Sequence, residues 1–296
     1  MKTKIPLLLF SGALTLASCF TNPITGRRSL NLQNEQEMLT MGTQQYASFL
    51  TENRPVSRNS SRDAEMVQRV GNRIANAVGV YLQSVGQQQL TEGYQWEFNL
   101  VNSNEANAWC MPGGKVVVYS GLLPLTQNEA GLAIVMGHEI GHAIARHGNE
   151  RMSQQMAVQL GGAALSTAMA TKPAMTQNIF LTAFGVGSQL GTLKYARTQE
   201  SEADRMGLIF AALAGYNPRE AIPFWQRMAA QGDGQKPPEI LSTHPSDATR
   251  IANIERLMPE ALTFYRPQGG TNSPSAPAPA PGGYRPPPRG AQTPRR

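Results

Sequence analysis

The sequence has little cysteine, few aromatic residues and a modest content of charge. Its 296 residues include 2 cysteines, 7% aromatic residues and 16% charged residues. Hydrophobic residues make up 41% of the chain and the mean hydropathy is -0.32. These values exclude a fully disordered chain and a polytopic membrane protein, and the length suits one sizeable domain or two small ones.

The excess positive charge lies at the two ends. The formal net charge is +6, yet residues 1–18 contribute two lysines and the last 30 residues contribute four arginines, with no acidic residue in either segment. The sequence between them holds 20 basic and 20 acidic residues. The basic pI therefore does not indicate a binding face, and we expect no nucleic-acid partner.

Residues 1–18 have the features of a secretory signal peptide. Two lysines precede an apolar run over residues 5–16, which is shorter than the roughly 20 residues of a membrane-spanning helix. Cys19 follows a Leu-Ala-Ser sequence that resembles the lipobox of bacterial lipoproteins. We expect cleavage before Cys19, lipidation of its thiol and a linker over residues 19–32. An ordinary cleaved signal with an incidental cysteine is the alternative.

The residue after Cys19 is Phe20 rather than an aspartate. By resemblance to enteric lipoproteins, this predicts the periplasmic face of the outer membrane, with the inner membrane as the weaker alternative. Lipidation would leave Cys110 as the one remaining thiol, so no internal disulfide is expected. Cys110 lies in an apolar stretch, which is typical of a small core residue.

The other end of the chain, residues 266–296, is rich in Pro, Gly and Arg. Nine of the 21 prolines lie in the last 30 residues. Such a segment can bury little apolar surface, so it is predicted to be a disordered tail. A solubilising role and contact with an anionic lipid or polymer both remain open for its arginines.

Residues 33–265 are predicted to form one mostly helical α+β domain with a small antiparallel sheet. Apolar residues recur at helical spacing in several segments, whereas shorter alternating segments predict strands. Thr126 and Glu129 are spaced as in a capping box, and His147 with Gly148 resembles a helix end. The predicted helices cover residues 33–50, 62–84, 126–147, 197–214, 218–230 and 246–258, and the strands cover 94–101, 105–109 and 115–119.

Residues 156–193 are rich in Ala, Gly, Met and Thr. A Lys-Pro pair at residues 172–173 interrupts this segment, and each half is too short to span a membrane. We therefore expect small-residue helices packed on the domain, or a lid.

The motif that carries chemistry is His138-Glu139-Ile140-Gly141-His142, an HExxH sequence inside a predicted helix. Residues four apart share a helix face, so His138 and His142 can bind one metal ion. Glu139 can reach a metal-bound water but not the metal, which suits a general base. The metzincin pattern is excluded because it requires a glycine at position 145 and a histidine at 148. His147 is rotated off the metal face and is predicted to cap the helix.

Zinc needs a further protein ligand, and Glu200 and Asp204 are candidates on one face of a downstream helix. One carboxylate can bind the metal while the other accepts a hydrogen bond from a ligand imidazole. Glu202 points away from that face. The alternative is a solvated acidic first turn of the helix.

The chain resembles metallopeptidase family 48, the group that contains HtpX-like proteases and CAAX prenyl endopeptidases, and it is most similar in layout to the periplasmic lipoprotein members. Five blocks carry the resemblance in the order found in the family. They are NPITGRRSLNL at residues 22–32, EANAWCMPGG at 105–114, HEIGHAIARH at 138–147, ESEAD at 200–204 and STHPSDATRI at 242–251.

The resemblance implies a gluzincin-type fold, one zinc ion per chain and a role for each matched residue. His138, His142 and Glu200 match the zinc ligands, Glu139 the catalytic base, and Asp204 the aspartate that supports a ligand.

Further roles follow from the same resemblance. Asn107, Ala108 and Trp109 match an edge strand that pairs with extended substrate. His244 matches a histidine that can occupy the open zinc position in a related periplasmic protease. It could instead donate a hydrogen bond to the oxyanion. Arg250 could stabilise the same charge or form a surface ion pair.

Together these features predict a lipid-anchored zinc metalloendopeptidase that degrades unfolded or misassembled cell-envelope proteins. The competing hypothesis is a non-catalytic, chaperone-like binding lipoprotein whose structural zinc is closed by His244.

Overall fold

The structure is a computed structural model. It describes residues 19–160, 173–184, 196–232, 239–244 and 248–267. The predicted signal peptide at residues 1–18 lies outside this part of the chain, as does almost all of the predicted tail. Of the segment 156–193, the gaps at 161–172 and 185–195 likewise lie outside it. No helix in the described ranges is long and apolar enough to cross a membrane.

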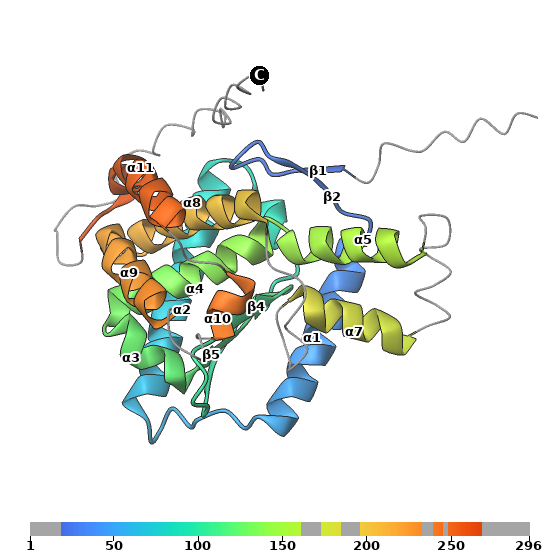
Figure 1. Cartoon of the computed structure of the whole chain (residues 1–296), viewed down its shortest axis with the longest axis horizontal. Coiled ribbons are helices and arrows are strands. Elements are labelled where there is room, and N and C mark those ends of the chain that lie inside the picture. The colour runs from blue at the N-terminus through green and yellow to red at the C-terminus, as the bar shows by residue number, and fades with distance from the viewer. Residues whose placement is uncertain (1–18, 161–172, 185–195, 233–238, 245–247, 268–296) are drawn as a thin grey trace, which may run out of the picture.

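The domain is mostly helical, and a small sheet lies near its centre (Figure 1). The α-helices are α1 (Glu35–Glu52), α2 (Arg62–Ser84), α3 (Leu123–Thr126), α4 (Glu129–Ile144), α5 (His147–Leu160), α7 (Pro173–Ala183), α8 (Arg197–Leu213), α9 (Ala221–Gly232), α10 (Glu239–Thr243) and α11 (Ala248–Phe264). The strands are β1 (Cys19–Thr21), β2 (Arg28–Leu30), β3 (Glu97–Val101), β4 (Ala108–Met111) and β5 (Lys115–Tyr119). Short 3-10 helices cover Gln88–Thr91, Ser120–Leu122 and Pro218–Glu220.

The central sheet has the strand order β3-β5-β4 and is mixed rather than antiparallel. Strands β4 and β5 form the expected antiparallel pair, whereas β3 pairs with β5 in parallel. Strands β3 and β4 are consecutive in the sequence but not neighbours in the sheet. The last strand, β5, lies between them. The predicted α+β class is confirmed, and the antiparallel description of the sheet is wrong for this one pair.

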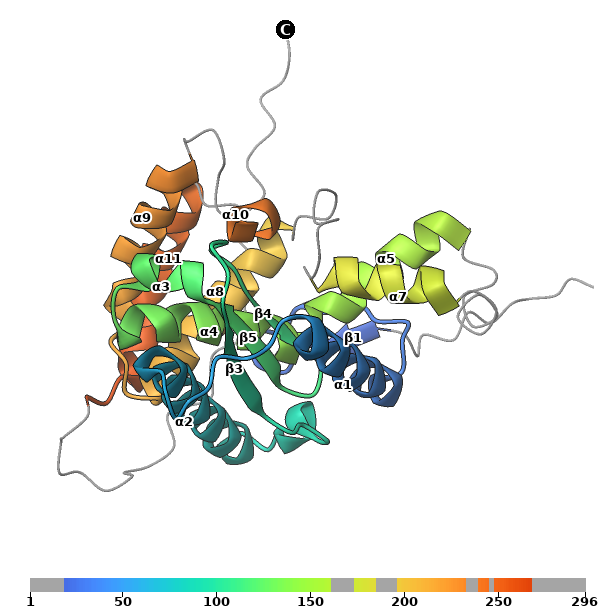
Figure 2. The same ribbon diagram turned by 90° about the horizontal axis from the view of Figure 1, so that it is seen from below.

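The two faces of the sheet pack against different cores. Alternating side chains such as Val116 and Val118 join α2 and α4 in the larger core. Val117 and Trp109 point to the other face, into a second core with α1, α5 and α7. Figure 2 shows the sheet with α2 and α4 to one side and α1 with α7 to the other. Cys110 is buried in the larger core, as predicted.

Helices α4 and α8 lie side by side at the centre of the domain (Figure 1). They touch through glycines, because a Cβ atom on Gly207 would lie 2.7 Å from the backbone N of His138. A Cβ on Gly137 would similarly lie 2.8 Å from the carbonyl oxygen of Gly207. This close approach allows side chains from both helices to reach the same small volume.

The ends of α4 differ from the prediction. Thr126 ends α3, and the N-cap of α4 is Asn128, whose side chain accepts a hydrogen bond from the backbone N–H of Gly131. At the other end, Arg146 adopts a left-handed conformation with φ 58° and breaks the helix, so His147 begins α5 instead of capping α4. The Arg146 guanidinium forms an ion pair with Glu35 at this bend.

The last helix also extends beyond its predicted end. Pro259 lies inside α11, which continues to Phe264. Phe264 is buried and packs edge-on against Tyr81, with ring centroids 6.0 Å apart. Burial of this final turn outweighs the hydrogen bond that proline removes.

Candidate metal centre

The two histidines of the HExxH sequence face one another from one side of α4. His138 and His142 are 2% and 3% exposed, and their Nε2 atoms lie 3.0 Å apart. The helix places them there because its apolar residues direct the whole stretch into the core. Both imidazoles are therefore shielded from water.

Glu200 of α8 and His244, which follows α10, complete a four-residue cluster. The Glu200 Oε1 lies 3.3 Å from His142 Nε2, and His244 Nδ1 lies 2.9 Å from the same oxygen. His244 Nδ1 is also 3.2 Å from His138 Nε2. One potential ligand atom from each of the four residues lies within 4.8 Å of all the others.

The hydrogen bonds of the rings show that this cluster suits a cation. His138 Nδ1 lies 2.9 Å from Asp204 Oδ1, which places the ring proton on Nδ1 and a lone pair on Nε2. Burial, together with the neighbouring His138, holds the pKa of His142 well below its usual value, which favours the neutral form of the His142 ring. Lone pairs from two imidazoles and a carboxylate then converge, and the donor set of two nitrogens and an oxygen matches a zinc site.

The carboxyl groups of Glu139 and Glu200 have shifted pKa values, in opposite directions. Burial raises the pKa of the Glu139 carboxyl, and among the described residues its Oε1 has no hydrogen-bond partner. That oxygen lies 3.6 Å from His244 Nε2. Burial also acts to raise the pKa of Glu200, but His244 and Arg250 hold it well below the usual range. These neighbours thus favour the charged carboxylate of Glu200, whereas burial makes the Glu139 carboxylate the better proton acceptor.

Arg250 of α11 binds two carboxylates of α8, those of Glu200 and Asp204. Its Nη1 lies 2.8 Å from Glu200 Oε2, its Nη2 2.7 Å from Asp204 Oδ1 and its Nε 3.0 Å from Asp204 Oδ2. The guanidinium carbon lies 3.4 Å from the centroid of the Trp225 ring. Arg250 is 6% exposed, so the alternative of a surface ion pair is wrong. A direct role for Arg250 at the oxyanion stays a prediction.

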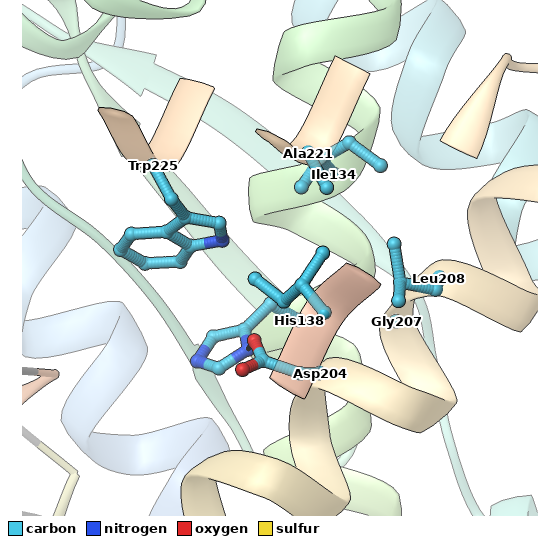
Figure 3. A pocket seen from close by; sticks show the side chains of 8 residues that line it. Ile134, His138, Asp204, Gly207, Leu208, Ala221 and Trp225 are labelled. Carbon is cyan, nitrogen blue, oxygen red and sulfur yellow. Dashed lines mark ion pairs between the residues drawn. The ribbon is translucent and has the colours of Figure 1, made fainter. Parts of the chain in front are cut away.

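The contact between His138 and Asp204 is buried beside a small, mostly apolar cavity. Figure 3 shows the Asp204 carboxylate beside the His138 ring, with apolar side chains and Trp225 around a small cavity. The apolar lining comes from Ile134, Leu208, Ala221, Trp225 and Ile254. Burial in these apolar surroundings lowers the local dielectric constant and strengthens the hydrogen bond between Asp204 and His138.

His147 is part of the site's surroundings rather than a helix cap. Its Nδ1 lies 2.7 Å from His142 Nδ1, and its Nε2 lies 2.9 Å from Glu202 Oε2. Burial lowers the pKa of His147. Glu202 points away from the cluster, as predicted, and although burial acts against it, His147 and Arg27 lower its pKa to about 2. The sequence contains both residues within the recognised motifs, but nothing in their spacing shows that they meet.

The predicted substrate strand lies next to the active-site helix. Ala108 and Trp109 belong to β4, which packs against α4 and is an edge strand in the described part of the sheet. Asn107 immediately precedes β4 and its carbonyl accepts a hydrogen bond from Tyr119 N at 3.0 Å. The Trp109 side chain belongs to the second core and packs on Phe49. Any contact with substrate therefore falls to the backbone of this strand.

The sequence pattern of Peptidase family M48 matches residues 61–258. The chain is 36% identical over 183 residues to mitochondrial metalloendopeptidase OMA1 of Saccharomyces cerevisiae, which covers 60% of this chain and 51% of that protein. It is 33% identical over 276 residues to metalloendopeptidase OMA1, mitochondrial, of Bos taurus, covering 88% and 51%. It is also 33% identical over 181 residues to the beta-barrel assembly-enhancing protease of Escherichia coli, covering 58% and 37%.

These relatives correct one prediction and limit others. Five relatives of the chain, from two yeasts, a plant and two mammals, are named mitochondrial metalloendopeptidases, which overturns the placement at the periplasmic face of the outer membrane. The chain spans about half the length of the OMA1 proteins quoted above. The substrates and partners of those longer proteins are therefore not assigned to this chain.

The matched region contains the cluster of two histidines, a glutamate and a further histidine, together with the HExxH helix. The predictions of a zinc cofactor and of a zinc metalloendopeptidase are confirmed by this match and by the names of the relatives. The chain belongs to peptidase family M48.

Proposed function

We propose that this zinc endopeptidase cleaves extended segments of unfolded or misassembled proteins at a membrane to which a lipidated Cys19 holds it. The observation that carries the proposal is the buried His138, His142 and Glu200 cluster with Glu139 on the same helix turn. The edge strand β4 beside α4 supports the choice of extended substrate. Cys19 is exposed at the start of β1, which suits an anchor.

In this mechanism His138, His142 and Glu200 would hold zinc, which when bound would supply Lewis acidity toward the scissile carbonyl and the attacking water. Glu139 accepts a proton from that water as its oxygen bonds to the carbonyl carbon. The same carboxylic acid then gives the proton to the leaving amine nitrogen as the C–N bond breaks. Its raised pKa makes the carboxylate a stronger base and so favours the first of these two proton transfers.

His244 determines whether the site is open or closed. Its Nδ1 belongs to the four-atom cluster, so it can act as a further ligand and leave less room for substrate. Although burial acts to lower it, the carboxylates of Glu200 and Glu139 raise the pKa of His244. We infer that His244 restrains the enzyme, and that removal of its ring increases cleavage.

The test is cleavage of unfolded casein by the purified chain, with a folded protein of similar size as the control. We expect cleavage of casein but not of the folded control protein. Activity should be lost on chelation of zinc and should recover when zinc is added. The His244→Ala variant should cleave faster, whereas a loss of activity would assign His244 to the oxyanion. Bound zinc without cleavage, in His244→Ala as well, would favour the non-catalytic binding protein. A Cys19→Ser variant that stays in the membrane fraction would contradict the anchor.

A further inference from the structure

The paired loop formed by β1, β2 and the turn between them reaches the metal centre through buried side chains. The turn runs over residues 22–27, and β1 pairs with β2 in an antiparallel register from Cys19 with Leu30 to Thr21 with Arg28. We call residues 19–30 the N-terminal hairpin. Figure 1 shows it lying over α5 and the end of α8, far in sequence from the residues it meets.

Side chains of the N-terminal hairpin surround the Glu202 carboxylate. Asn22 Nδ2 donates to Glu202 Oε1 at 2.8 Å, and the Thr25 hydroxyl donates to the same oxygen. Arg27 Nε donates to Oε2, and its two terminal nitrogens bind Glu150 at 3.0 and 2.7 Å. Asn22 and Thr25 are 1% and 2% exposed. Three side chains of the hairpin thus donate hydrogen bonds to the Glu202 carboxylate, in addition to its contact with His147.

The protons along the path have one consistent direction. His142 Nε2 faces the metal cluster, so its proton is on Nδ1, which donates to His147 Nδ1. His147 then carries its proton on Nε2 and donates it to Glu202 Oε2. In this arrangement each ring offers one nitrogen as donor and the other as acceptor. Rotation of His142 would break its bond to His147.

We propose that His147, Glu202 and the hairpin residues around Glu202 are positioning residues that fix the ring of His142 and thereby set the zinc affinity. Such outer partners orient a ligand imidazole and raise its basicity, and their loss costs about 10- to 100-fold in metal affinity. The N-terminal hairpin, next to the proposed lipid anchor, is then a structural part of the zinc site. This inference rests on the zinc site and not on the substrate.

The first test compares zinc binding by His147→Gln and Glu202→Gln with that of the unaltered chain, by competition with a chromogenic chelator. We expect zinc to bind about 10- to 100-fold more weakly in His147→Gln and about tenfold more weakly in Glu202→Gln. Thr25→Val removes one hydroxyl at the outer end and is a mild change in case His147→Gln does not fold. Its affinity should also fall, by a smaller factor.

A matched control and a spectrum separate positioning from general stability. Glu260→Gln removes the ion pair with Arg205, which also contacts the hairpin at the carbonyl of Ile24 but not His147. The visible spectrum of the cobalt-substituted protein should change in His147→Gln and Glu202→Gln and stay unchanged in Glu260→Gln. Unaltered affinity and spectrum in the first two variants would overturn the proposal. An equal loss in Glu260→Gln would overturn it too. A failure of casein cleavage with intact zinc effects would count against the proposed function alone.

Discussion

The two histidines of the HExxH sequence on α4 are held in different ways, although each relies on a carboxylate of α8 and an arginine from elsewhere. His138 contacts Asp204 directly, and Arg250 of α11 binds that carboxylate. His142 reaches Glu202 through the ring of His147, and Arg27 of the N-terminal hairpin binds Glu202. The pair of helices α4 and α8 thus supports one histidine of the cluster by a direct contact with a carboxylate. It supports the other through an intervening imidazole.

The arginines should give the largest difference in stability between the two supports. Arg250→Gln leaves Asp204 and Glu200 as buried carboxylates without their cation, which should cost about 3–5 kcal/mol of unfolding free energy. Arg27→Gln should cost less, because the Arg27 side chain is 17% exposed and that of Arg250 only 5%. Chemical denaturation of the two variants measures the difference. An equal loss would show that the difference in burial does not decide how much each arginine stabilises the fold.

The carboxylates should differ in their effect on zinc. Asp204→Asn acts on His138 without an intermediate, so we expect zinc affinity to fall by about 100-fold, the upper end for such partners. Glu202→Gln acts through His147 and should cost about tenfold. Chelator competition on both variants gives the ratio. A larger effect for Glu202→Gln would reverse the order of the two supports.

The glycines at the crossing of α4 and α8 sharpen the same comparison at the level of packing. Gly207→Ala places a Cβ 2.7 Å from the backbone N of His138, so we expect a loss of about 1–3 kcal/mol in unfolding free energy. Gly141→Ala, near His142, meets its nearest atom, Ala203 O, at 3.0 Å and should cost less. Thermal unfolding of the metal-free variants tests this. Equal destabilisation by Gly207→Ala and Gly141→Ala would mean that a shift of the two helices relieves the closer contact at Gly207.

Much of the fold follows from periodicity in the sequence. The helix predicted over residues 62–84 has these bounds, and the strand at 115–119 is observed as β5. The errors lie where tertiary contacts decide. The parallel pairing of β3 with β5 depends on the path of the chain, and the extension of α11 beyond Pro259 depends on burial of its last turn. Neither is encoded in local spacing.

The site divides in the same way. Residues four apart on one helix, such as His138 with His142 and Glu200 with Asp204, could be placed together from sequence because the helix fixes their relative direction. His147 was misassigned because its place depends on the left-handed Arg146, which ends α4 early and turns the chain. The contact between His147 and Glu202 joins residues 55 apart, and no sequence rule fixes such a contact.

The measurement that tests the central claim most directly is casein cleavage by Glu139→Gln, with zinc content determined on the same preparation. Glu139 is not among the four residues of the cluster, so the variant should retain zinc near one ion per chain. Loss of the general base should reduce cleavage by about 10²- to 10⁴-fold. Zinc retained with cleavage at the unaltered rate would contradict the assignment of Glu139 as the base and the mechanism built on it.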